Sequence, residues 1–137
     1  MLKYMLDTNI AIYVIKRRPA ELLETFNKYD GHMCISSITL AELLHGVEKS
    51  TMPENNLRNV EDFVSRLEVL HYDDSAASHY GEIRADLEKK GTPIGVNDLH
   101  IAGHARSQAL TLVSNNTKEF IRVEGLRLIN WTENPNS

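Results

Sequence analysis

The chain has 137 residues, 42% of them hydrophobic and 25% charged, which is typical of one globular domain with its own core. Fifteen lysines and arginines against nineteen aspartates and glutamates give a net charge of −4. This balance excludes a protein that coats nucleic acid through its overall charge, but it leaves room for a local basic surface.

The first apolar run is interrupted by Lys3 and ended by Asp7, so we expect no membrane span or secretory leader and a cytoplasmic protein. The lone Cys34 has apolar neighbours and is expected to be a buried, reduced thiol.

Short apolar runs alternate with helical patterns along the whole chain. Strands are expected at the run that ends with Leu6 and at residues 33–36, 69–72, 110–114 and 126–129. Helices are expected at residues 8–17, 20–29, 38–50, 53–67 and 74–90, from Asn97 or Asp98 onward, and as a short turn through Glu119 and Phe120. This alternation predicts a three-layer α/β/α domain with a mostly parallel sheet of about five strands. The domain is expected to span residues 1–132, followed by a polar, flexible tail at 133–137.

Polar residues follow three of the predicted strands. Asp7 ends the first strand, and Glu42 lies in the first turns of the helix after the second. Asn116 and Glu119 follow the fourth strand, and Asp98 is expected to open a helix that leans over the same edge. Carboxyl ends of parallel strands meet at one edge, where clustered carboxylates need cations between them to remain ionised. Oxygen ligands alone favour Mg²⁺ or Mn²⁺ over zinc.

Each of these residues also has an ordinary structural explanation. Asp7 and Asp98 suit helix N-caps, Glu42 suits an exposed helical position, and Asn116 suits a turn. For any one residue taken alone, the structural explanation is preferred. Their recurrence at strand ends favours a metal site, and the pattern by itself leaves both interpretations open.

Four segments resemble the motifs of the PIN-domain ribonucleases. They are residues 6–9 (LDTN), 37–46 (SITLAELLHG), 95–102 (GVNDLHIA) and 114–120 (SNNTKEF). The similarity covers nearly the whole chain, in order and at the right separations. It is greatest to the VapC toxins of bacterial toxin–antitoxin pairs, particularly the enterobacterial type.

The resemblance implies that Asp7, Glu42 and Asp98 are the catalytic, metal-binding acids. It also implies that Thr8 and Asn9 orient Asp7 and the waters around the metal. Many PIN domains carry a fourth acid where this chain has Asn116, which offers only a neutral carbonyl oxygen. That difference leaves open whether one metal ion or two are bound. Glu119, from the next turn, is a candidate to compensate, and capping or facing solvent are the alternatives.

The function implied by the resemblance is Mg²⁺- or Mn²⁺-dependent hydrolysis of an RNA phosphodiester, leaving 5′-phosphate and 3′-hydroxyl ends. The enterobacterial type implies cleavage in the anticodon stem-loop of initiator tRNA, which inhibits translation and growth. The implied partners are the RNA, a cognate VapB-like antitoxin, a second copy in a homodimer and a larger toxin–antitoxin assembly.

Several other residues are candidates for contacts with substrate. The basic cluster Lys16-Arg17-Arg18 lies one short helix from Asp7, and Asn97 adjoins Asp98. His45 lies one turn from Glu42 on much the same face, where packing is favoured and a substrate contact is the alternative. His100 and His104 have the spacing of a zinc pair but point about 200° and 240° around the helix from Asp98. We expect these two to be exposed or to face a partner.

Two other functional classes compete with a nuclease. One is a catalytically silent PIN-fold module that binds RNA or a partner, and Asn116 is the residue that favours it. The other is an aspartyl-phosphate domain, since an aspartate follows the first strand. That class is ranked last because Asn9 stands where a second acid is expected.

Overall fold

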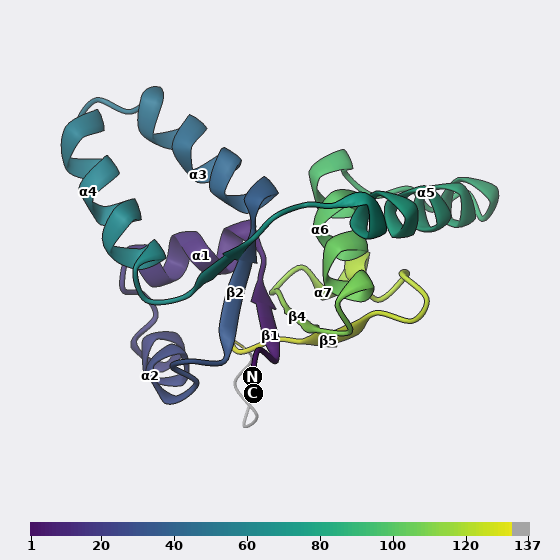
Figure 1. Ribbon diagram of the computed structural model, residues 1–137, viewed down its shortest axis with the longest axis horizontal. Coiled ribbons are helices and arrows are strands. Elements are labelled where there is room, and N and C mark those ends of the chain that lie inside the picture. The colour runs from purple at the N-terminus through teal and green to yellow at the C-terminus, as the bar shows by residue number, and fades with distance from the viewer. Residues whose placement is uncertain (133–137) are drawn as a thin grey trace.

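A sheet of five short strands runs through the middle of the molecule (Figure 1). The computed structural model describes residues 1–132, and every strand pairing in this part of the chain is parallel. The sheet order is β3–β2–β1–β4–β5, so the N-terminal strand is central. The strands are β1 (Tyr4–Leu6), β2 (Met33–Ser36), β3 (Glu68–Leu70), β4 (Thr111–Val113) and β5 (Arg127–Ile129).

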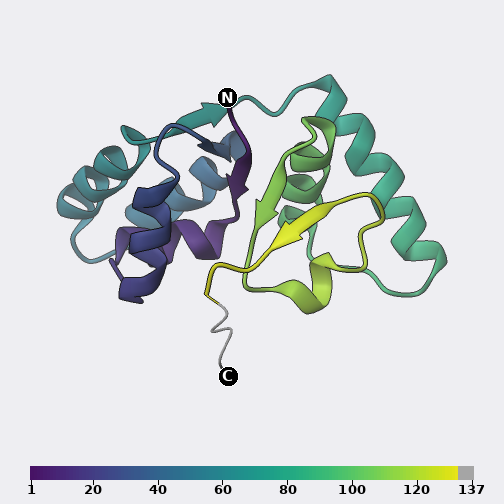
Figure 2. The ribbon, with the colours of Figure 1, turned by 90° about the horizontal axis from the view of Figure 1, so that it is seen from below.

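Helices cover both faces of the sheet, with α1 to α4 on one side and α5 to α7 on the other (Figures 1 and 2). They are α1 (Thr8–Ile15), α2 (Ala20–Lys28), α3 (Ser37–Glu48), α4 (Pro53–Val64), α5 (Asp74–Lys89), α6 (Val96–Ser107) and α7 (Thr117–Phe120). The predicted three-layer α/β/α fold is confirmed. No helix within residues 1–132 has the length and apolar content that a membrane crossing requires. The predicted tail, residues 133–137, lies outside the described residues.

Adjacent residues of the central strand serve opposite cores. Met5 packs with Leu99 and Leu112 beneath α5 and α6, whereas Leu6 packs with residues of α1 to α4. Both side chains are fully buried. A strand buried on both faces has no polar alternation, which is why the chain shows continuous apolar runs rather than a period of two. Cys34 is buried in the first of these cores, as predicted.

Helices α5 and α6 approach each other closely at Gly103. A Cβ atom placed there would lie 2.8 Å from the backbone nitrogen of Tyr80 and 3.1 Å from the carbonyl oxygen of Ala76. Hydrogen at this position therefore allows the two backbones to meet. Ala102 and Ala105, on either side of Gly103 along α6, are fully buried.

The two histidines of α6 are not exposed, and this corrects the expectation from sequence. His104 is 1% exposed, and its Nδ1 lies 2.8 Å from Oγ of Ser36. His100 is half-buried, with Nδ1 2.7 Å from the Tyr72 hydroxyl and its ring stacked on Tyr80 at a centroid distance of 4.1 Å. Helix α6 is enclosed by the sheet and by α5, so the side turned away from Asp98 is also an interior side.

We predict that Gly103→Ala destabilises the fold by about 1–3 kcal/mol, because the added methyl group overlaps backbone atoms that cannot rotate away. Gly81→Ala is the matched control, since Gly81 is also helical and an added Cβ would meet nothing within 4 Å. The control is expected to stabilise by up to about 1 kcal/mol through helix propensity. Urea unfolding of both variants measures the difference, and equal stabilities would contradict the close contact.

We also predict that His104 makes the protein sensitive to mild acid. Burial lowers the pKa of His104, with the Asp73 charge opposing that shift. A histidine whose pKa is lower in the folded state than its unfolded value of about 6.5 stabilises the fold above that pH and loses this contribution as the pH falls. Between pH 7.5 and 5.5, wild-type protein should therefore lose more unfolding free energy than His104→Gln. Identical losses in the two proteins would assign the acid sensitivity to other groups.

Candidate active site

Asp7 is held at the end of the central strand. Its side chain is 3% exposed, and Oδ1 accepts a hydrogen bond of 2.9 Å from the backbone N–H of Ile10, which makes it the N-cap of α1. Burial raises the pKa of Asp7, and the Glu42 charge raises it further, while hydrogen bonds from Ser114 and Ile10 oppose the shift. Asp7 is therefore the N-cap of α1 and also a carboxylate whose ionisation is opposed by the charge of Glu42.

Glu42 reaches this edge from α3. Its Oε1 accepts a hydrogen bond of 2.7 Å from the hydroxyl of Thr8, and that hydroxyl also lies 3.2 Å from Oγ1 of Thr39. The side-chain hydroxyl of Thr8 therefore orients Glu42, the acid on α3, through a hydrogen bond. Asn9 is exposed, and no hydrogen bond joins its side chain to Asp7 within residues 1–132. The orienting role predicted for Asn9 remains a prediction.

Asp98 lies in the first turn of α6. The helix begins at Val96 with Gly95 as its N-cap, so the expected start at Asn97 or Asp98 was late and Asp98 is not the cap. The pKa of Asp98 is raised to about 6. Burial is the largest cause, followed by the charges of Asp7, Glu119 and Glu42 in that order. This carboxylate therefore lies within electrostatic range of three others, and the predicted convergence of the acids is present in the structure.

Asn116 and Glu119 form a pair at the end of β4. Nδ2 of Asn116 donates a hydrogen bond of 3.1 Å to Oε2 of Glu119. The Asn116 backbone N–H donates to Oγ of Ser114 at 2.9 Å. Glu119 is half-buried, and its charge acts on Asp98. The role of Glu119 in place of a fourth acid remains a prediction.

The four carboxylates supply the donor type that hard divalent cations take, namely oxygen without nitrogen or sulfur. Their mutual repulsion, visible in the raised pKa of Asp98, is the electrostatic state that a cation would relieve. Within residues 1–132, no three His, Cys, Asp or Glu side chains stand close enough together to hold an ion without moving. The donor set fits Mg²⁺ or Mn²⁺ in chemistry, and binding would require the carboxylates to close together.

The remaining candidate residues lie at the surface. Lys16, Arg17, Arg18 and Asn97 are all exposed. His45 is exposed as well, so the expectation that it packs was wrong, because only the neighbouring side of α3, with Leu43 and Val47, faces the core. A contact of these residues with substrate remains a prediction.

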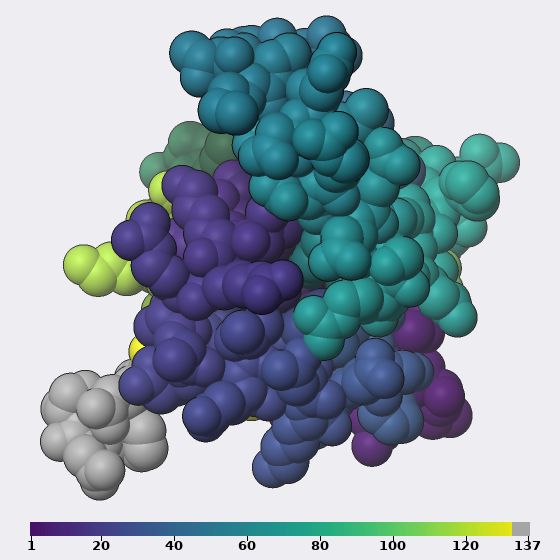
Figure 3. Space-filling view, turned by 90° about the vertical axis from the view of Figure 1, so that its left-hand side faces the viewer, coloured from purple at the N-terminus to yellow at the C-terminus, as the bar shows by residue number. Residues whose placement is uncertain are grey.

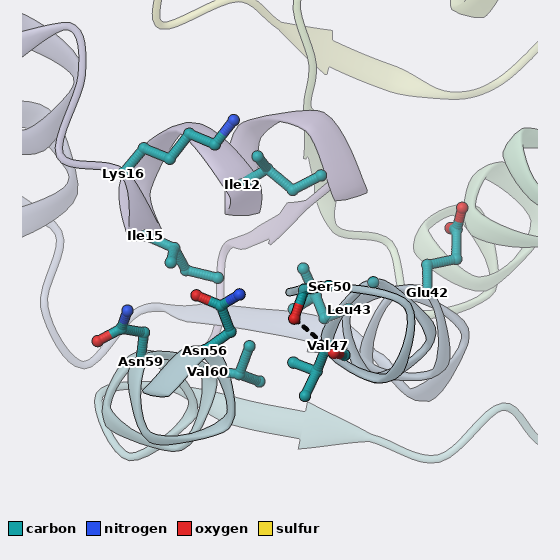
Figure 4. A pocket seen from close by; sticks show the side chains of 11 residues that line it. Ile12, Ile15, Lys16, Glu42, Leu43, Val47, Ser50, Asn56, Asn59 and Val60 are labelled. Carbon is teal, nitrogen blue, oxygen red and sulfur yellow. Dashed lines mark hydrogen bonds between the residues drawn. The ribbon is translucent and has the colours of Figure 1, made fainter. Parts of the chain in front are cut away.

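A groove that the sequence did not reveal opens beside Glu42. It has a volume of about 500 Å³ and lies between α1, α3 and α4. In Figure 4, Ile12 and Ile15 face Val47 and Val60 across it, with Glu42 toward one end. Polar side chains at its margin are those of Lys16, Ser50, Asn56 and Asn59. The sequence signal for this groove was the number of apolar residues on α1. Ile12 and Ile15 are only partly buried, so the core does not cover all of them.

Comparison with known proteins identifies the family. Residues 4–126 match the family described as PIN domain. The chain belongs to the PIN-domain family. The resemblance drawn from the four motifs is thereby confirmed.

Named relatives match over almost their full lengths. Ribonuclease VapC2 of Haemophilus influenzae is 61% identical over 131 residues, which cover 96% of this chain and 99% of the relative. The tRNA(fMet)-specific endonuclease VapC of Shigella flexneri is 58% identical over 132 residues, covering 96% and 100%. Among solved structures, DNA-bound VapBC from Salmonella typhimurium matches with a TM-score of 0.92 and 56% identity, covering 96% and 99% of the two chains.

We predict that Asp98→Asn stabilises the protein in the absence of divalent cations. The folded-state pKa of about 6 lies above the unfolded value of about 3.9, so ionisation of Asp98 opposes folding. That penalty is fully present above pH 6 and disappears as the pH falls toward 4. Asp98→Asn should therefore unfold at higher urea than wild type at pH 7.5, with a smaller advantage at pH 4.5. Asp62→Asn, at an exposed position on α4, is the control; a variant at 98 no more stable than this control would show that the charge of Asp98 does not oppose folding.

Proposed function

We propose that this chain is a metal-dependent endoribonuclease and the toxin of a bacterial toxin–antitoxin pair. The observation that carries the proposal is the convergence of Asp7, Glu42, Asp98 and Glu119 at one edge of a parallel sheet. Relatives more than 55% identical over nearly the whole chain are named ribonuclease VapC and tRNA(fMet)-specific endonuclease VapC, which supports the reaction and the substrate class.

The residues of this chain would bind and align the reacting groups. Asp7, Glu42 and Asp98 would hold Mg²⁺ or Mn²⁺, with Glu119 beside them as a further oxygen donor. When bound, the ion lowers the pKa of the attacking water and offsets charge on the phosphate. Thr8 fixes the carboxylate of Glu42, and the N–H of Ile10 fixes that of Asp7. These bonds pre-orient two of the acids before substrate arrives.

The reaction is a hydrolysis at phosphorus. Water adds to the phosphorus atom and the bond to the 3′ oxygen breaks. The leaving oxygen takes a proton, which gives a 5′-phosphate and a 3′-hydroxyl end. The substrate we propose is initiator tRNA, cut in the anticodon stem-loop, with inhibition of translation and growth as the consequence. Such a substrate places the activity in the cytoplasm.

The assembly we propose contains a VapB-like antitoxin. Solved structures that match this chain include VapBC complexes, among them those from Salmonella typhimurium and Rickettsia felis bound to DNA. The latter has a TM-score of 0.90 and 44% identity. Pairing with an antitoxin follows for this chain by similarity. A homodimer of the toxin and a larger toxin–antitoxin assembly complete the proposal.

A catalytically silent RNA-binding module is the second candidate. It is favoured by Asn116, which stands where many PIN domains have an acid. This alternative predicts RNA binding without strand cleavage at any concentration of Mg²⁺ or Mn²⁺. A cleavage assay with Mg²⁺ or Mn²⁺ distinguishes the endoribonuclease from the silent RNA-binding module.

We predict that purified protein cuts initiator tRNA with Mg²⁺ or Mn²⁺ and that Asp7→Asn lowers the cleavage rate by at least about 100-fold. Asparagine is chosen because it is as good an N-cap as aspartate, so α1 keeps its cap while the ligand charge is lost. Asp62→Asn, exposed on α4, should cut like wild type. Product ends are mapped on gels, and circular dichroism confirms folding.

Two results would contradict this proposal. Cleavage that continues after chelation of divalent cations would refute the metal mechanism. An Asp7→Asn protein that cuts as fast as Asp62→Asn would refute the role of the acid.

A further inference from the structure

Tyr13 is the exposed aromatic side chain of residues 1–132. It is 38% exposed, whereas the remaining phenylalanine, tyrosine and tryptophan rings in this part of the chain are buried or half-buried. Most of them pair with one another, as in the group of Tyr4, Tyr29 and Trp131. The ring of Tyr13 is partly open to solvent.

The position of Tyr13 connects it to the acids. Asn9, Tyr13 and Lys16 lie at i, i+4 and i+7 on α1, so they share one face of the helix, and all three are exposed. Nδ2 of Asn115 donates a hydrogen bond of 3.4 Å to the Tyr13 hydroxyl, and Asn115 precedes the residue that holds Glu119. Along the helix axis, Tyr13 is about 9 Å from Asp7. An exposed stripe therefore runs from the carboxylate edge to Lys16.

A hollow with basic side chains lies next to this stripe. It has a volume of about 510 Å³ and is lined by Tyr13, Lys16, Arg18 and Pro19. The ion pairs formed within residues 1–132 involve Arg84, Lys90 and Arg106, so the cations of the hollow are not neutralised by a carboxylate. In Figure 3 the purple atoms of α1 lie at the surface between those of α2 and α4. A partly exposed tyrosine ring thus lies beside Lys16 and Arg18, which form no ion pair within residues 1–132.

Charge complementarity selects the ligand for this hollow. The chain carries a net charge of −4, and its carboxylate edge repels phosphate until a cation binds. A polyanion that must approach that edge therefore needs a positive surface close by. Proteins that bind single-stranded nucleic acid combine a positive groove for the backbone with aromatic rings on which bases stack. Tyr13 with Lys16 and Arg18 has both parts.

We propose that Tyr13 stacks on an unpaired nucleobase of the substrate RNA while Lys16 and Arg18 bind the flanking phosphates. This inference rests on the proposed function. It assigns Tyr13 a role in specificity, because a base within a duplex has both faces covered and cannot stack on the ring. The substrate class is thus RNA with a loop or single strand beside the cut.

The test measures binding and cleavage separately. Binding of an initiator-tRNA anticodon stem-loop and of a fully paired RNA duplex is measured by fluorescence anisotropy in an Asp7→Asn background, which prevents cutting. Tyr13→Ala should raise the Kd for the stem-loop by about 5- to 150-fold, the range that loss of one stacked base produces. Its Kd for the duplex should not change. Tyr13→Phe should stay within about twofold of the parent, because the ring rather than the hydroxyl makes the contact.

The positive charges are tested through salt dependence. For a single strand, the logarithm of the binding constant decreases linearly with the logarithm of the salt concentration. The steepness of this decrease becomes smaller by about 0.7 for each phosphate contact that is lost. Lys16→Ala and Arg18→Ala should each show this change, whereas Lys89→Ala, an exposed lysine on α5, should not. Leu57→Ala is the control for Tyr13→Ala, since Leu57 is also 38% exposed. In otherwise wild-type protein, Tyr13→Ala should raise KM for tRNA more than it lowers kcat.

Failure of this inference is distinguishable from failure of the proposed function. If wild-type protein cuts no RNA, the proposed function fails. If wild type cuts and Tyr13→Ala binds the stem-loop as tightly as Leu57→Ala does, only the stacking role is overturned. Equal weakening by Tyr13→Phe would assign the hydroxyl instead of the ring. Unchanged RNA affinity with weakened binding of the antitoxin would assign the surface to a protein partner.

Discussion

Repulsion between carboxylates at one edge of the sheet is the constraint on which the arrangement of this molecule depends. Parallel strands direct all their carboxyl ends to the same edge, so whatever follows β1, β2 and β4 must meet there. Asp7, Glu42 and Glu119 arrive by this route, and α6 adds Asp98. Burial raises the pKa of Asp7 and of Asp98 most, and the charges of neighbouring acids raise both further. The two apolar cores on either face of the sheet hold these charges together against their repulsion.

Neutral hydrogen-bonding neighbours keep the acids in place. Thr8 donates to Glu42, Asn116 donates to Glu119, and the N–H of Ile10 donates to Asp7. Each bond favours a fixed orientation without adding another charge to the cluster. Asp7 shows that the two explanations considered for a strand-end acid do not exclude each other. It caps α1 through one oxygen, while the same side chain contributes its charge to the cluster.

The sequence predicted the fold well because burial on both faces leaves a simple signal. Runs such as Met33–Ser36 are buried along their whole length, and the helical patterns between them are long enough to recognise. The errors concern tertiary contacts. Helical periodicity gave the direction of His104 around α6 but not what covers that side, which is Ser36 of the sheet. Likewise, the exposure of Tyr13 beside the buried Val14 depends on which neighbours cover α1, and residue type alone does not show this.

Asn116 illustrates why a motif comparison can misjudge a single position. Read along the chain, it is an amide in place of a fourth acid and therefore a weaker ligand. In the structure its amide donates to Glu119 at 3.1 Å. An aspartate at position 116 has no proton to donate at neutral pH, and it would bring a like charge against Glu119. Asn116 therefore allows the carboxylate of Glu119, from the following turn, to remain at the edge. The cluster thus has four acids, although position 116 does not carry the acid that many PIN domains have there.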